Sequence, residues 1–160
     1  MINNVSNSRK IMSRFGDLLK GETTTPEPTV VIEAPEPVEV KVDFGVICGM
    51  RTEEEQRELV NKGASKTMRS KHLTGHAVDL MAYVGSRGSW ELNLYDDLAD
   101  AMKEAAIQEG VQVRWGAAWH INDMRDWDGT MEDAMNAYID LRRSQGRRPF
   151  IDGPHFELMD

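Results

Sequence analysis

The sequence predicts an α+β fold in which a small sheet packs against helices. Three short apolar runs have the β-branched and aromatic content of strands, at residues 44–48, 77–84 and 111–116. Between and after these runs, apolar residues recur at intervals of three and four, which is the period of an amphipathic helix. A chain of 160 residues is long enough for one domain with a substantial core.

Helices are expected at three places. Thr52 and Glu55 form a capping box at the start of the first helix, which runs to about residue 62. The second helix spans about 92–109 and ends before a glycine. The third follows a capping threonine and spans about 130–143.

The charge and hydropathy of the chain argue against two classes of partner. The net charge is −8 at pH 7 and the pI about 5.0, with lysines and arginines scattered along the chain, whereas binding nucleic acid needs a basic face. No run approaches the roughly 18 consecutive apolar residues of a membrane span. The N-terminus also lacks the apolar segment of a signal peptide. We therefore expect a soluble protein without its own export signal and without stable membrane association.

Cys48 is the only cysteine of the chain. An intrachain disulfide is therefore excluded, which fits synthesis in a reducing compartment. Because Val46 and Ile47 precede it, we expect Cys48 to be a small buried residue rather than a nucleophile.

The first 41 residues differ in composition from the remainder. Residues 1–20 are polar with a few apolar positions near helical spacing, so that a short amphipathic helix and a frayed terminus are both open. Residues 21–41 contain four of the six prolines, interleaved with Glu, Thr and Val. Proline removes backbone donors and favours extended neighbours, so this segment is predicted to be a semi-rigid acidic linker. The globular domain then occupies residues 42–160.

Two separated segments supply a candidate metal site. His72 and Asp79 lie in the first segment, and His155 lies near the C-terminus. Two imidazoles and one carboxylate suit zinc and leave a fourth tetrahedral position for water or substrate, which is typical of catalysis. Asp79 stands in an apolar run, where a metal ion or an arginine must satisfy its charge. From spacing alone, solvated histidines near a turn are an equally good interpretation.

Asp152 is the candidate general base, because it lies three residues before His155 and need not be a ligand itself. In an ordinary strand, positions three apart face opposite sides. The intervening Gly153 and Pro154 break regular structure, so both side chains can face one site. Glu157 is the alternative base.

The segments 70–79 (Ser-Lys-His-Leu-Thr-Gly-His-Ala-Val-Asp) and 152–157 (Asp-Gly-Pro-His-Phe-Glu) resemble the two motifs of one enzyme family. This is the family of zinc D,D-carboxypeptidases and L-alanyl-D-glutamate endopeptidases, and the second motif resembles that of its phage endolysin branch. The resemblance extends from about Val42 to the C-terminus. It implies a small antiparallel sheet packed against helices with a zinc site at the sheet, the fold of these peptidases and of Hedgehog.

The resemblance implies a zinc metallopeptidase that hydrolyses the L-alanyl-D-glutamate bond of the peptidoglycan stem peptide during host lysis. His72, Asp79 and His155 would bind Zn²⁺, and Asp152 would transfer the proton. A monomer is expected. It would pass from the host cytoplasm to the periplasm once a holin has permeabilised the inner membrane.

Three further residues are expected at the substrate. Arg51 lies between a strand and a helix N-terminus, where it could grip a carboxylate or carbonyl or form a surface salt bridge. In the resembling family an arginine and a glutamine in this segment bind substrate, which implicates Arg51 and Gln56. Ser70 is expected near the substrate or behind the metal ligands.

Aromatic residues of the third quarter leave two interpretations open. Trp115, Trp119 and Trp127 could form an apolar wall for substrate, or could be packed in the core, which is the commoner place for tryptophan. His120 has no partner at metal-binding spacing, so a surface loop or the substrate cleft is expected for it. Residues 117–148 resemble an insertion relative to compact endolysins.

Two alternatives to the endopeptidase are kept. The first is a D-alanyl-D-alanine carboxypeptidase or dipeptidase with the same metal site. The second is a catalytically inactive, zinc-containing module that binds the cell wall.

Overall fold

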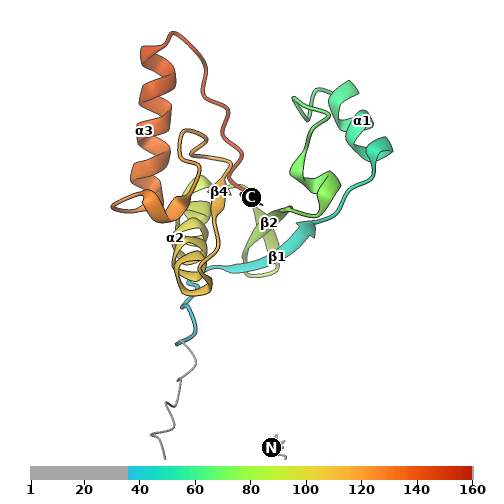
Figure 1. Cartoon of the computed structure of the whole chain (residues 1–160). Helices are drawn as coiled ribbons and strands as arrows, with labels where there is room; N and C mark the ends of the chain where they lie inside the picture. Colours follow the sequence, from blue (N-terminus) through green and yellow to red (C-terminus); the bar gives the residue numbers. More distant parts are fainter. Residues whose placement is uncertain (1–35, 160) are drawn as a thin grey trace, which may run out of the picture. The chain divides into compact units, whose positions relative to one another are not determined.

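The structure is a computed structural model and describes residues 36–159 (Figure 1). The predicted segment 1–20 and most of the predicted linker 21–41 lie outside the described residues, so both stay predictions. Residues 36–41 form no helix or strand. The helices and strands are, in chain order, β1 (Asp43–Cys48), α1 (Glu53–Asn61), a 3-10 helix (Lys71–Thr74), β2 (Ala77–Val84), β3 (Arg87–Ser89), α2 (Leu92–Glu109), β4 (Val113–Trp115), a second 3-10 helix (Met124–Asp126), α3 (Met131–Ser144) and β5 (His155–Leu158).

All strand pairs of the described residues are antiparallel and belong to one sheet with the order β1-β2-β5-β4, and β3 pairs with the end of β2. Three helices accompany the sheet, so the predicted α+β fold is confirmed. The register places Asp79 of β2 opposite His155 of β5 and opposite Cys48 of β1. Sheet pairing therefore brings the two sequence motifs together.

The helices begin where the sequence predicts. The Thr52 hydroxyl accepts a hydrogen bond from the Glu55 amide at 3.2 Å, and the Glu55 carboxylate accepts from the Thr52 amide at 2.8 Å. This reciprocal pair confirms the capping box of α1. Thr130 caps α3 in the predicted way, and Gly110 ends α2 in the left-handed region at φ 67°.

The hydrophobic core packs α2 and α3 against β4, β5 and the buried positions Leu80 and Ala82 of β2. Figure 1 shows α2 and α3 on the same side of the molecule. The large buried side chains of the core include Tyr95, Trp115, Met124, Met131 and Phe156. The indole of Trp115 stacks on Phe156 with ring centroids 6.3 Å apart. No helix among the described residues combines the length and the apolar character needed to cross a bilayer.

The β1 and α1 side of the sheet has little core of its own. On β1, Phe44 is 47% exposed and Val46 is 64% exposed, and the one buried residue of α1 is polar, Gln56. Cys48, at the end of β1, is half-buried rather than fully buried, and its sulfur lies 3.8 Å from His72 Nδ1.

Candidate active site

His72 lies on the 3-10 helix that leads into β2. Ser70 caps this helix by accepting the His72 amide at 3.4 Å, and Gly75 ends it in the left-handed region at φ 72°. The buried imidazole has its Nδ1 2.7 Å from the Gly49 carbonyl, so Nδ1 carries the proton and donates. The lone pair of Nε2 is left for a metal.

His155 is the first residue of β5, and it binds its protein acceptor through Nε2, whereas His72 uses Nδ1. Its Nε2 lies 3.1 Å from a Glu157 carboxylate oxygen, to which it donates, while its Nδ1 faces Asp79. Both histidines thus use one ring nitrogen to bind a fixed acceptor. This is the usual arrangement around a metal, because the acceptor fixes the tautomer and the ring orientation.

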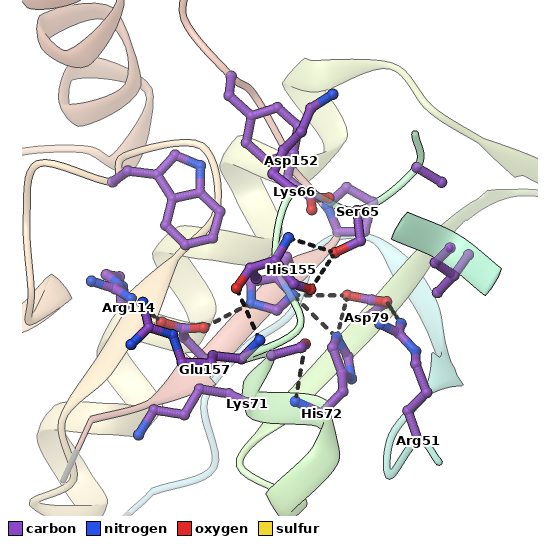
Figure 2. Close-up of a pocket in the computed structure, with 18 of the residues that line it drawn as sticks. Arg51, Ser65, Lys66, Lys71, His72, Asp79, Arg114, Asp152, His155 and Glu157 are labelled. Atoms are coloured by element: carbon purple, nitrogen blue, oxygen red, sulfur yellow. Dashed lines mark hydrogen bonds and ion pairs between the residues drawn. The ribbon is translucent and has the colours of Figure 1, made fainter. Parts of the chain in front are cut away.

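Three candidate ligand atoms form a nearly equilateral triangle (Figure 2). His72 Nε2 is 3.2 Å from Asp79 Oδ1 and 3.2 Å from His155 Nδ1, and His155 Nδ1 is 3.0 Å from Asp79 Oδ1. With zinc–ligand lengths of about 2.0–2.1 Å, tetrahedral ligands stand roughly 3.3 Å apart. The residues therefore fit a tetrahedral metal ion with one open position.

Cys48 offers a different ligand set with His72 and Asp79, in which the ligand atoms lie within 4.8 Å of one another. The Cys48 sulfur is 3.8 Å from His72 Nδ1, the nitrogen that already donates to Gly49. It also accepts a hydrogen bond from Arg51 at 3.2 Å. The geometry therefore favours His155 over Cys48 as the third ligand.

Hydrogen bonds set the charges of these groups when no metal is bound. Burial raises the pKa of the Asp79 carboxyl, but the adjacent imidazoles of His155 and His72 outweigh burial and hold that pKa well below its usual range. Burial lowers the pKa of His155, but hydrogen bonds to Asp79 and Glu157 outweigh it and raise that pKa to about 9. A metal ion would thus displace a proton from His155 at neutral pH.

The turn at residues 152–155 places Asp152 in the lining of the cleft that also contains this triangle. The Asp152 amide donates to the Gly116 carbonyl at 2.9 Å, and the Trp115 indole donates to the Gly153 carbonyl at 2.7 Å. A Cβ on Gly116 would lie 2.4 Å from the Asp152 carbonyl oxygen, so only glycine permits this approach. Among the described residues, none donates a hydrogen bond to the Asp152 carboxylate, and burial raises its pKa.

Glu157 is held between His155 and Arg114. One carboxylate oxygen accepts from His155, and the other accepts from Arg114, whose Nε is 2.8 Å away and whose terminal nitrogen also makes an ion pair. Glu157 is buried, and Arg114 lies opposite it across the β4–β5 pair. Because both oxygens are occupied, the structure does not support Glu157 as the alternative base; it orients His155 instead.

The triangle lies in a cleft of about 670 Å³. One side of the cleft, the polar wall, comes from Arg51 and residues 64–67 and 69–71. The other side, the packed wall, comes from Arg114, Trp119, Tyr138 and Phe150. In Figure 1, α1 and α3 stand on the two sides of the sheet that carry these walls.

Comparison with known proteins places this chain in a family. The family model of phage L-alanyl-D-glutamate peptidases matches residues 14–159. The chain belongs to this family. The match begins ahead of the domain boundary predicted at residue 42.

Three relatives of this peptidase carry related names. The L-alanyl-D-glutamate peptidase of Escherichia phage T5 is 27% identical over 151 residues, which are 91% of this chain and 98% of the relative. That of Listeria phage A118 is 37% identical over 70 residues, 44% of this chain but 24% of the relative. A crystal structure of the Serratia marcescens L-Ala D-Glu endopeptidase ChiX has a TM-score of 0.52 and 36% identity, covering 74% of this chain and 68% of that one.

The predicted substrate residues of this peptidase have different environments. Arg51 donates to the Gln56 side-chain oxygen at 2.7 Å and to Asp79 Oδ2 at 3.4 Å, and its side chain lines the cleft. Gln56 does not line the cleft, because it is fully buried and its amide nitrogen donates to Ser65 Oγ at 2.8 Å and to the Thr67 carbonyl at 2.6 Å. Gln56 thus lies behind Arg51 and holds it, and the expected contact between Gln56 and substrate stays a prediction.

The tryptophans divide between the two interpretations. Trp119 lines the cleft and stacks on His155 at 5.6 Å and on Phe150 at 6.2 Å between ring centroids. Trp115 is fully buried, and Trp127 packs against the core. His120 is exposed and outside the cleft lining.

Ser70 lines the cleft as well as capping the 3-10 helix. Two residues that sequence reasoning missed, Arg114 and Gly116, also shape the site. The one sequence signal for them is their place at the end of the predicted strand 111–116.

Proposed function

We propose that this peptidase is a zinc-dependent endopeptidase that hydrolyses the bond between L-alanine and D-glutamate in the peptidoglycan stem peptide, and that it acts as a phage endolysin. The observation that carries the proposal is the triangle of His72 Nε2, Asp79 Oδ1 and His155 Nδ1, with sides of 3.0–3.2 Å. Nitrogen and carboxylate donors in this number suit zinc and leave one position open. The names of the relatives support the bond that is cut.

Zinc, when bound, supplies a Lewis acid that activates water and polarises the scissile carbonyl. The proposed role of Asp152 is to accept the proton of the attacking water and to pass it to the departing glutamate nitrogen. Its raised pKa, caused first by burial, suits both halves of this transfer. Arg51 would donate a hydrogen bond to the carbonyl oxygen as negative charge develops there.

The remaining residues of the proposed site hold these groups in place. Glu157 and the Gly49 carbonyl keep His155 and His72 in the tautomers that face the ligand triangle. Gln56 fixes Arg51, and Ser70 fixes the 3-10 helix of His72. We assign Trp119 to an apolar surface beside the scissile bond.

The proposal extends to how the enzyme is organised and where it acts. We propose a monomer with segments 1–20 and 21–41 ahead of a peptidase domain at 42–160, and a path from host cytoplasm to periplasm after a holin opens the inner membrane. The phage origin of two relatives supports this path. Fractionation of infected cells with and without holin function tests it: lysis at the normal time without holin would contradict it.

Mass spectrometry of a muropeptide digest tests the reaction. Zinc-loaded protein should release fragments with a new D-glutamate N-terminus, and a chelator should stop the release until zinc is restored. Released D-alanine would instead indicate a D,D-carboxypeptidase. Intact muropeptides after incubation with folded, zinc-loaded protein would indicate a wall-binding module.

A further inference from the structure

The cleft carries a charge opposite to that of the whole chain. The chain has a net charge of −8. Cations nevertheless outnumber carboxylates on the cleft lining, where the cations are Arg51, Lys66, Arg69, Lys71 and Arg114 and the carboxylates are Asp79, Asp152 and Glu157. A cleft that is lined mainly by charges of one sign, with low-dielectric walls, concentrates ligands of the opposite charge. The lining therefore favours an anionic ligand.

The cations of the cleft differ in the protein acceptors that their side chains bind. Arg51 is committed to Asp79 and Gln56, and Arg114 is committed to Glu157. Lys66 reaches a backbone carbonyl, that of Gly63, at 3.4 Å. The backbone amide of Arg69 donates to Thr67 Oγ1 at 2.9 Å, and the Arg69 guanidinium has no carboxylate partner among the described residues.

Lys66 and Arg69 belong to a segment whose backbone is held by hydrogen bonds from the buried Gln56 side chain. The buried Gln56 amide donates to Ser65 Oγ and to the Thr67 carbonyl, the residues on either side of Lys66. Holding the backbone in this way lowers the entropy lost when the side chains bind a ligand. In the view of Figure 2, Ser65 and Lys66 lie on the Asp152 side of His155, away from Arg114 and Glu157.

We propose that Lys66 and Arg69 form a subsite for the free carboxylate of the glutamate on the leaving side of the scissile bond. The inference rests on the proposed function, in which Asp152 delivers a proton to the glutamate nitrogen. Glutamate has two carboxyl groups, and a peptide that continues through one of them leaves the other charged. Two cations in a cleft bind such a carboxylate with charge-assisted hydrogen bonds, whereas a carboxamide at the same place is neutral.

The consequence is selection between acidic and amidated stem peptides. Two synthetic peptides that contain the L-alanyl-D-glutamate bond and differ only in a free carboxylate or a carboxamide on the glutamate test it with zinc-loaded protein. The wild type should favour the carboxylate peptide by about tenfold in kcat/KM, as expected for one charge-assisted hydrogen bond. Most of the difference should lie in KM, and it should shrink as added salt screens the charges.

Variants separate this subsite from general charge effects. Lys66→Gln with Arg69→Gln should bring the two peptides to the same kcat/KM, and Lys66→Arg with Arg69→Lys should keep the preference. Lys62→Gln is the matched control, because Lys62 is exposed, pairs with Glu58 at 3.2 Å and lies outside the cleft. It should keep the full preference.

Two results would overturn the subsite while leaving the proposed function intact. The first is equal cleavage of both peptides by the wild type, and the second is a preference that survives in the Lys66→Gln, Arg69→Gln variant. Cleavage of neither peptide by folded, zinc-loaded wild type would overturn the proposed function and the subsite together.

Discussion

The packed wall of the cleft rests on a hydrophobic core, whereas the polar wall rests on hydrogen bonds. Behind the packed wall, Trp115 and Phe156 are 1% and 2% exposed. Behind the polar wall, the one buried side chain of α1 is Gln56, and the neighbouring β1 exposes Phe44 and Val46. Burial of apolar surface stabilises without regard to direction, while a polar network must be complete to stabilise at all.

The metal-ligand triangle joins these two constructions. His155 comes from β5 in the packed half, and His72 comes from the 3-10 helix beside the polar wall. The His72 carbonyl accepts a hydrogen bond from the Arg51 amide at 3.0 Å. A bound metal would therefore hold the two walls together, because its ligands come from both halves.

The largest expected effect comes from removing the proton acceptor without disturbing either wall. Asp152→Asn keeps the shape of the side chain, so zinc content and melting temperature should stay at wild-type values. Turnover of muropeptides should fall by roughly 10²–10⁴, the usual contribution of a general acid–base group. Asp126→Asn, at an exposed position outside the cleft, serves as the control. Wild-type turnover by the Asp152→Asn enzyme would contradict the assignment.

The second prediction concerns the pH dependence of zinc affinity. Because hydrogen bonds to Asp79 and Glu157 raise the pKa of His155 to about 9, that histidine is protonated at pH 7 in the metal-free protein. Zinc must displace this proton, so affinity should rise about tenfold per pH unit from pH 7 and level off near the pKa. Chelator competition between pH 6.5 and 9.5 measures it.

Glu157→Gln provides the control for this titration. The variant removes one of the two acceptors that raise the His155 pKa, so the pH at which the affinity levels off should move to lower values. An affinity that is independent of pH between 7 and 9 in the wild type would contradict the coupling.

The third prediction concerns the local stability of the polar wall relative to that of the packed wall. Gln56→Ala removes one hydrogen-bond partner from the Thr67 carbonyl and one from the Arg51 guanidinium, at a cost of about 1–3 kcal/mol. Hydrogen exchange should accelerate in residues 62–71 while α2 keeps its protection. Gln108→Ala, at an exposed position of α2, is the matched control. Equal acceleration in both halves would show that the walls unfold together.

The local parts of this site could be predicted from the sequence, whereas the parts made by long-range strand pairing could not. The capping box gave the start of α1, and the two motifs supplied the residues that form the triangle. Gln56 was expected at the substrate because of the family resemblance, and nothing in an acidic, polar helix indicates that this residue is the buried one. Arg114 faces Glu157 because β4 pairs with β5, and that register is set by packing across the sheet rather than by neighbouring residues.

The smallest expected effect lies inside the packed half. Asp96 of α2 is 8% exposed, its Oδ1 is buried without a hydrogen-bond partner among the described residues, and burial with nearby acidic groups raises its pKa to about 6. The folded state therefore holds this proton more tightly than the unfolded chain, and stability falls as pH rises from about 4 to 6. Asp96→Asn should raise the free energy of unfolding at pH 7.5 by on the order of 1 kcal/mol, and by little at pH 4.

Denaturant titrations of Asp96→Asn at the two pH values make this measurement. Asp128→Asn, at an exposed position, is the control and should leave the stability unchanged at both. Equal stabilisation by Asp96→Asn at pH 4 and pH 7.5 would mean that the ionised carboxylate is not the cause.

The most direct test of the site is a crystal structure of the zinc-loaded protein with anomalous scattering measured at the zinc edge. The account predicts one zinc ion at about 2.0–2.2 Å from His72 Nε2, Asp79 Oδ1 and His155 Nδ1. The Cys48 sulfur should remain with Arg51, outside the coordination sphere. A zinc ion bound by Cys48, or one that leaves His155 uncoordinated, would contradict it.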